Sequence, residues 1–242
     1  MLRLENVYFS YESKNYILED ISLEFKKGLK IAILGRNGCG KTTLMLLCSG
    51  ILKPKKGKIF IDDLEVKNPR LLKKHVGIVF QNPDTQLLAA KVYQDISFGL
   101  FNLGFGKDIV KKKVEEIIKR LGIEHLKNKP TQFLSYGQKR LVSIADILVM
   151  EPEYIFLDEP EAYLDYKSFL KVQEIISELP KEGKSVIIST HDSDFAFEWA
   201  DYIYVIDNKT VALHGTPDYV FSQLEDLQKI GLKIPLIKRL EV

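Results

Sequence analysis

The chain contains a glycine-rich segment of a kind that binds phosphate. Residues Gly35 to Thr42 read GRNGCGKT, which matches G-x-x-x-x-G-K-[ST], between the apolar run LKIAIL and the helical pattern TTLMLLCSGIL. The glycines let backbone N–H groups point at one anion, and the helix adds its positive dipole end. Lys41 would reach the β- and γ-phosphates, and the Thr42 hydroxyl would bind Mg²⁺. The alternative is a glycine-rich turn that only caps a helix.

Two acidic residues, Asp158 and Glu159, end another apolar run, YIFLDE. The carboxyl ends of parallel strands are where such sheets bind ligands. Asp158 would hold Mg²⁺, and Glu159 would accept a proton from an attacking water. His191 follows SVIIST, where it could hydrogen-bond a γ-phosphate or that water. Gln81 follows HVGIVF, where its amide oxygen could bind Mg²⁺ or a water. Solvated acids and a structural histidine are the alternatives.

The stretch LSYGQKR, residues 134–140, predicts a second anion site. Ser135 and Gln138 have the spacing of a capping box, so Ser135 would be the N-cap of a helix that runs to Met150. A helix N-terminus with a glycine in its first turn can bind an anion. An ordinary capped helix is the alternative.

These residues need elements that position them. Strands are expected at Leu2–Phe9, Ile21–Phe25, Leu29–Leu34, His75–Gln81, Tyr154–Asp158, Ser185–Thr190 and Tyr202–Asp207, with an antiparallel hairpin over Lys56–Val66. Helical patterns dominate from Asn82 to Met150, and one of them places Ile109, Val110, Val114, Ile117, Ile118 and Leu121 on one face. Further helices are expected over Tyr166–Leu179 and Asp194–Ala200. Alternating strands and helices predict an α/β fold with a mostly parallel sheet.

The organisation we expect is one domain over residues 1–242. Its core, with an antiparallel β subdomain, would comprise residues 1–81 and 151–215, with a helical subdomain inserted at 82–150 and a tail at 216–242. The net charge of +2 does not argue for nucleic acid, and the lysines at 53, 55, 56 and 58 read as a solvated face. Neither a signal peptide nor a membrane span is expected.

The two cysteines, Cys39 and Cys48, indicate no disulfide framework, which fits a reducing cytosol. Cys39 lies inside the phosphate-binding segment. It is either a low-pKa thiolate at a helix N-terminus or a small residue lining the cradle.

Together these motifs resemble the nucleotide-binding subunits of ABC transporters over nearly the whole chain. GRNGCGKTT is similar to Walker A, Gln81 to the Q-loop, LSYGQ to the signature, YIFLDE to Walker B, Glu161–Asp165 to the D-loop and His191 to the switch histidine. Tyr11 resembles the aromatic residue that stacks on adenine. The resemblance implies a P-loop NTPase fold, ATP and Mg²⁺ as cofactors, and an ATPase that works as a head-to-tail dimer.

The resemblance also assigns expected roles. ATP would be bound by Tyr11, Gly35, Arg36, Asn37, Gly38, Cys39, Gly40, Lys41, Thr42 and Thr43. The partner's ATP would meet Ser135, Tyr136, Gly137, Gln138 and Asp165. Lys41, Gln81, Glu159 and His191 would be catalytic, with Thr42, Gln81 and Asp158 at Mg²⁺. Tyr136 departs from the family pattern, which has glycine. We expect it to crowd the dimer interface or to weaken the site for the partner's ATP, with activity reduced but still present.

A narrower resemblance begins at Gln81. The segment to Gly99, with Gln86 at a family-like position and Gln94 in place of a more usual Glu, is similar to energy-coupling-factor and cobalt-type importer ATPases. This implies a second ATPase subunit and a membrane T component as partners, uptake of a metal ion or vitamin, and a place at the cytoplasmic face of the membrane. We expect no nucleic acid partner. The alternative is a soluble ABC-type ATPase that acts on nucleic acid or ribosomes.

Overall fold

A six-stranded, mostly parallel sheet forms the centre of the structure, a computed structural model that describes residues 1–12 and 15–240. Its strand order is β10 (Thr210–Gly215), β9 (Tyr202–Asp207), β3 (Lys30–Leu34), β8 (Ser185–Thr190), β7 (Tyr154–Asp158) and β6 (Val76–Val79). Neighbours from β9 to β6 are parallel, and β10 is antiparallel to β9. The predicted core sheet is confirmed, although the sequence argument did not anticipate β10.

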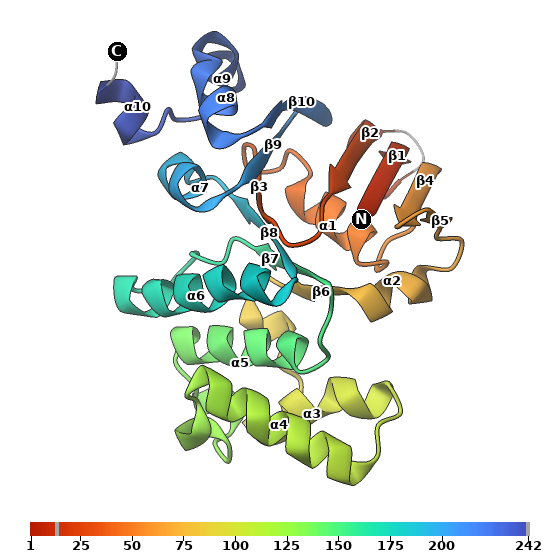
Figure 1. The fold of residues 1–242 in the computed structure, drawn as a ribbon, viewed down its shortest axis with the longest axis vertical. Coiled ribbons are helices and arrows are strands. Elements are labelled where there is room, and N and C mark those ends of the chain that lie inside the picture. The colour runs from red at the N-terminus through yellow and green to blue at the C-terminus, as the bar shows by residue number, and fades with distance from the viewer. Residues whose placement is uncertain (13–14, 241–242) are drawn as a thin grey trace.

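The second sheet is antiparallel and lies to the right in Figure 1. Its order is β2 (Leu18–Phe25), β1 (Leu2–Phe9), β4 (Lys56–Ile61) and β5 (Leu64–Glu65). The last two strands form the hairpin predicted from the sequence. Strand β2 begins at Leu18, three residues before the predicted start, and Leu18 is fully buried.

Three helices gather at the bottom of Figure 1. They are α3 (Val92–Asn102), α4 (Lys107–Leu121) and α5 (Tyr136–Leu148), with single 3₁₀ turns η1 (Pro83–Thr85), η2 (Glu124–Leu126) and η3 (Thr131–Phe133) around them. Helix α4 buries most of its predicted apolar face, but Ile109 is 50% exposed, so its assignment to that face was wrong. Helix α5 ends two residues before the predicted Met150.

Of the remaining helices, some pack around the central sheet and the last three follow β10 at the C-terminal end of the described residues. They are α1 (Lys41–Cys48), α2 (Pro69–His75), α6 (Tyr166–Glu178) with η4 (Leu179–Glu182), α7 (Ser193–Trp199), α8 (Pro217–Ser222), α9 (Leu224–Ile230) and α10 (Leu236–Leu240). Alternate residues of β3 enter two different apolar cores, because successive side chains point to opposite faces. Helix α2 was not predicted, although Asn68 caps it and Pro69 begins it.

Four parallel strands bring the candidate chemistry to one edge of the sheet. The residues Gly35, Gln81, Glu159 and His191 come directly or almost directly after β3, β6, β7 and β8, respectively. Because these strands run the same way, their carboxyl ends lie together.

Candidate nucleotide-binding site

The glycine-rich segment forms a tight loop between β3 and α1. Gly40 has φ 109°, and a Cβ there would lie 2.7 Å from Leu18 Cδ2. A Cβ at Gly35 would lie 2.5 Å from both Cys39 Sγ and the Ile206 carbonyl oxygen. Side chains at these two positions would therefore clash with neighbours that the fold holds in place, and glycine is needed for the loop to curl.

Lys41 places its ammonium group over the loop. The residue is 6% exposed, and its Nζ donates to the carbonyl oxygens of Gly35 at 2.8 Å and Arg36 at 3.3 Å. A cavity of about 320 Å³ opens beside it. The cavity is lined by Ile17, Asn37, Gly38, Gly40, Lys41, Thr42, Thr43, Gln81 and Glu159. It therefore joins the loop to two of the strand-end residues that the sequence argument selected.

Asp158 is held in place beside Thr42. It is 4% exposed, and its Oδ2 accepts a hydrogen bond from the Thr42 hydroxyl at 2.6 Å. Its Oδ1 accepts from the hydroxyl of Ser189, which also accepts from the backbone N–H of Glu159 at 3.1 Å. Ser189 thus orients both acidic residues. Sequence reasoning missed it because a serine inside a buried strand carries no spacing signal.

Glu159 is held by its neighbours and by an unusual backbone. Its φ is 41°, in the left-handed region that non-glycine residues adopt at a cost, often at functional sites. Gln81 donates from Nε2 to Glu159 Oε2 at 2.6 Å. His191 Nδ1 lies 3.6 Å from Glu159 Oε1, beyond hydrogen-bond distance, and its side chain is 58% exposed. Gln81 and His191, which were predicted from two other strand ends, therefore lie beside the Glu159 carboxylate.

Tyr11 lies beside the loop, and Cys39 belongs to it. Tyr11 is 57% exposed, and its hydroxyl is 3.3 Å from Thr43 Oγ1, with its ring edge against Phe9. The ring is thus beside the loop and accessible. Burial raises the pKa of the Cys39 thiol, although Lys41 acts in the opposite direction. The thiol is therefore not the low-pKa thiolate of the first interpretation, and Cys39 packs as a small residue.

The segment LSYGQKR forms the start of α5. Ser135 is the N-cap: its hydroxyl accepts from Gln138 N at 3.3 Å, and Gln138 Oε1 accepts from Ser135 N at 3.1 Å. The predicted capping box is confirmed. Gly137 faces Ser168 in the first turn of α6, where a Cβ would lie 2.6 Å from the serine hydroxyl. Asp165 caps α6 by accepting from Ser168 N at 2.8 Å, so the two helix N-termini lie side by side.

The same segment grips the residue that follows β6. Arg140 is fully buried, and its guanidinium donates to the carbonyl oxygens of Phe80 at 2.6 Å and Gln81 at 2.5 Å. The Tyr136 hydroxyl donates to the same Gln81 oxygen at 3.0 Å, and its ring meets the edge of Tyr163. Tyr136 therefore has an intramolecular contact that the sequence argument did not foresee. In the sequence, Arg140 stood out only as one of two adjacent cations, Lys139 and Arg140.

Ser135, Gly137 and Asp165 do not line the glycine-loop cavity of this chain. Ser135 and Asp165 are exposed at the protein surface. A single copy thus brings together the residues around Lys41, Asp158 and Glu159 but leaves the α5 N-terminus facing outward.

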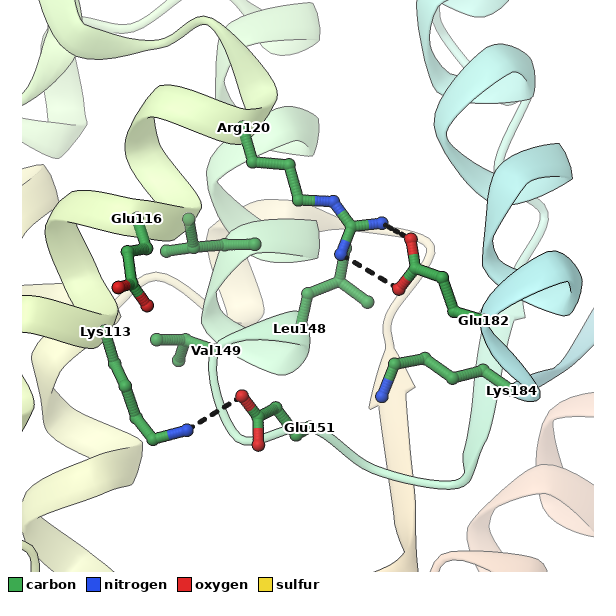
Figure 2. A pocket seen from close by; sticks show the side chains of 9 residues that line it. Lys113, Glu116, Arg120, Leu148, Val149, Glu151, Glu182 and Lys184 are labelled. Atoms are coloured by element: carbon green, nitrogen blue, oxygen red, sulfur yellow. Dashed lines mark hydrogen bonds and ion pairs between the residues drawn. The ribbon is translucent and has the colours of Figure 1, made fainter.

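A second cavity, of about 600 Å³, lies between α4, the end of α5 and η4. Figure 2 shows two of its cations paired with acids: Lys113 pairs with Glu151 at 2.8 Å, and both Nη atoms of Arg120 contact Glu182. The third, Lys184, donates to the Pro152 carbonyl oxygen at 3.2 Å. The paired charges give this cavity no evident anion-binding role, unlike the loop around Lys41.

Comparisons with known proteins agree with this geometry. A family model described as ABC transporter matches residues 18–162, more than half of the chain. The chain therefore belongs to the ABC transporter family, and it is an ATP-binding protein of the ABC ATPase class.

Its relatives include ATPases of one transporter group. The chain is 43% identical to an energy-coupling factor transporter ATP-binding protein, EcfA2, of Clostridium perfringens, over 99% of this chain and 86% of that protein. It is 41% identical to EcfA of Methanocaldococcus jannaschii, over 99% and 88%. Among solved structures, cbiO1 of Clostridium perfringens, part of an ABC transporter complex, has TM-score 0.83, 42% identity and coverage of 99% and 98%.

A more distant neighbour shows the same fold. It is a dimeric ATP-binding cassette in a post-hydrolysis state, bound to ADP and Pi, with TM-score 0.80, 26% identity and coverage of 90% and 99%. Within the part of the present chain that the structure describes, no helix has both the length and the apolar character needed to span a bilayer.

Proposed function

We propose that this chain is the ATP-hydrolysing subunit of an energy-coupling-factor or cobalt-type importer. It would pair head to tail with a second ABC ATPase, a copy or a homologue, at the cytoplasmic face of the membrane. A permease bound to the pair would take up a metal ion or a vitamin. One observation carries the proposal: Glu159, with Gln81 and His191 beside it, stands at the cavity that also holds Lys41 and Thr42.

Each residue of the site has a defined task in hydrolysis. The loop N–H groups and Lys41 bind the β- and γ-phosphates, so that the γ-phosphorus faces the attacking water. Glu159 accepts the proton of that water, and His191 hydrogen-bonds the γ-phosphate. Since little covalent chemistry falls to the protein, catalysis is mostly positioning and neutralisation of charge. The Gln81 contact with Glu159 links this step to the helical insertion.

The residues present fit Mg²⁺. Thr42 Oγ1 and Asp158 Oδ2, 2.6 Å apart, are the hard oxygen donors that this ion prefers. In the described residues no group of three or more His, Cys, Asp or Glu could hold a metal alone. The ion would therefore be held by Thr42, Asp158 and Gln81 together with nucleotide oxygens. When bound, it would neutralise charge on the β- and γ-phosphates.

The outward-facing N-terminus of α5 supports the dimer. Ser135 is the N-cap of α5 there, Gly137 lies in the first turn of α5, and Asp165 stands next to them at the N-terminus of α6. In the head-to-tail pair this surface would close over the partner's γ-phosphate. ATP would then be bound between two chains, and hydrolysis would separate them.

Exposed apolar side chains on the helical insertion support a permease contact. Leu88, Phe98, Phe101 and Leu103 are all exposed, on α3 and its flanking loops. Buried Asp95 fixes the loop by accepting from the N–H groups of Leu88 at 3.0 Å and Ala89 at 2.6 Å. A cytoplasmic helix of a membrane subunit would dock on this apolar surface.

The ATPase proposal is tested with Glu159→Gln. This variant should bind Mg²⁺–ATP and form a stable dimer in light scattering, because the proton acceptor is lost while the binding contacts remain. The exposed Glu174→Gln on α6 serves as a control and should behave as the wild type. A Glu159→Gln variant that stays monomeric with saturating Mg²⁺–ATP, alone and with its permease, would overturn the head-to-tail dimer.

The permease proposal is tested with two leucines of equal exposure. Leu88 and Leu64 are each 77% exposed, but Leu64 lies in β5, on the antiparallel sheet. Leu88→Asp should abolish co-purification of a membrane protein, whereas Leu64→Asp should not. Equal recovery with both variants would reject the docking surface. Recovery with ribosomes or nucleic acid instead would favour the soluble ATPase.

A further inference from the structure

The hydroxyl group of Thr190, the residue before His191, hydrogen-bonds to Asp192, the residue after it, and also to Glu161. Thr190, the last residue of β8, accepts at Oγ1 from the backbone N–H of Asp192 at 2.9 Å. The same hydroxyl donates to Oε1 of Glu161. The histidine backbone therefore sits in a small loop closed by Thr190, and Glu161 sets the direction in which the Thr190 hydroxyl points.

Glu161 is an acid in an environment that disfavours its charge. Its Oε2 is inaccessible to solvent and has no hydrogen-bond partner within residues 1–12 and 15–240. Burial raises the pKa of the Glu161 carboxyl, while the Thr190 hydrogen bond lowers it. A buried carboxyl oxygen without a partner costs free energy. The contact with Thr190 is the only side-chain hydrogen bond recorded for Glu161 among the described residues.

The downstream side of His191 is fixed as well. Asp192 caps α7 by accepting from Asp194 N at 2.9 Å and Phe195 N at 3.1 Å. In contrast, the imidazole itself is mostly exposed and lies 3.6 Å from Glu159. Its position therefore depends on the backbone that carries it rather than on contacts of the ring.

We propose that Glu161 is a positioning residue for His191. By holding the Thr190 hydroxyl, it keeps the turn that carries the imidazole beside Glu159. This rests on the proposed function, in which His191 contacts the γ-phosphate. Glu161 also belongs to the turn that leads to Asp165 at the outward-facing surface. A movement of that turn in the dimer would therefore reach His191 through the Glu161–Thr190 contact.

The kinetic test uses variants that remove or keep the contact. Glu161→Ala should lower kcat by about tenfold, because a small displacement of a positioned group is costly. The KM for ATP should change less than about twofold, since neither Glu161 nor Thr190 lines the cavity. Glu161→Gln should keep most of the activity, because its amide oxygen can still accept from Thr190. Glu174→Ala on α6 is the matched control.

A double-mutant cycle separates positioning from general damage. Thr190→Val should reproduce Glu161→Ala, Thr190→Ser should restore activity, and the double variant should be no worse than either single one. Additive losses in kcat would overturn the proposal. A parallel fall of kcat, ATP affinity and melting temperature in Glu161→Ala would overturn it as well.

A second readout needs no hydrolysis. The chain has four histidines, so the His191 signals of ¹⁵N-histidine-labelled protein can be assigned with His191→Ala. Glu161→Ala should shift those signals and leave the other three unchanged, whereas Glu161→Gln should shift them little. Unchanged His191 signals in Glu161→Ala would refute the positioning role even if the protein were no ATPase. An inactive wild type with shifted signals would instead contradict the proposed function alone.

Discussion

Replacement of Arg140 by methionine tests whether the start of α5 holds the Gln81 segment in place. The side chain is fully buried, and its guanidinium donates to the carbonyl oxygens of Phe80 and Gln81. Methionine fills much of the aliphatic volume but donates nothing. Phe80 O would then lose this donor, while Gln81 O would keep the Tyr136 hydroxyl.

The magnitude follows from these contacts. Two hydrogen bonds to a charged donor are worth about 3–6 kcal/mol in sum. Part of this loss is offset, since burial desolvates the guanidinium and lowers the pKa of Arg140, a cost that methionine does not have. We therefore expect the free energy of unfolding to fall by about 2–4 kcal/mol, which lowers the melting temperature by about 5–15 °C. We also expect a lower kcat, because Gln81 would no longer be held against Glu159.

The neighbouring cation provides the control. Lys139→Met removes an ion pair with exposed Asp84, 2.6 Å long, and should cost less than about 1 kcal/mol. Chemical denaturation of both variants, followed by ATPase assays at a temperature where each is folded, measures the difference. If Arg140→Met were as stable and as active as Lys139→Met, the clamp on the Gln81 segment would be refuted.

Changes at three further positions have defined outcomes. Tyr136→Phe removes one hydrogen bond to Gln81 O and should lower the free energy of unfolding, measured in urea, by about 0.5–1.5 kcal/mol. Tyr136→Gly tests whether the tyrosine crowds the dimer interface, and an unchanged ATPase rate would exclude such crowding. Gly40→Ala should abolish binding of a fluorescent ATP analogue, because the φ of 109° and the contact with Leu18 exclude a Cβ; retained binding would contradict the loop geometry. Asp146→Asn addresses pH. Burial, with Asp95 nearby, raises the pKa of Asp146 well above its usual value, so the folded wild type binds the proton more tightly and loses stability as pH rises above about 4. The neutral variant should therefore gain stability relative to the wild type in denaturation series from pH 5 to 8, and parallel curves would count against the raised pKa of Asp146.

The sequence predicted which residues lie together at the strand ends, and it did so for a physical reason. Short apolar runs that lead into Gly35, Gln81, Asp158 and His191 favour buried strands, and parallel strands bring their carboxyl ends together. The cap at Ser135 was also predictable, because a capping box is local in sequence. Both arguments require only neighbouring residues and one rule of sheet geometry.

The contacts that hold these residues in place were not predictable in the same way. Arg140 is about 60 residues from the carbonyl oxygens that it binds, and Thr190 is about 30 residues from Glu161. Such pairs depend on how α5 and the turn after β7 pack, which no periodicity encodes. Ile109 shows the same limit, because its position on the apolar stripe of α4 did not guarantee a neighbour to cover it.

The ion-paired cavity of Figure 2 has a mechanical consequence. Helix α4 is tied across it by Lys113–Glu151 and Arg120–Glu182, pairs that are partly exposed and therefore weak and sensitive to salt. At the edge of the glycine-loop cavity, buried Arg140 joins the same group of helices far more firmly to the Phe80 and Gln81 carbonyl oxygens after β6. A tilt of these helices would therefore widen the ion-paired cavity, with the Gln81 segment as the pivot. High ionic strength would weaken the two ion pairs and make that tilt easier.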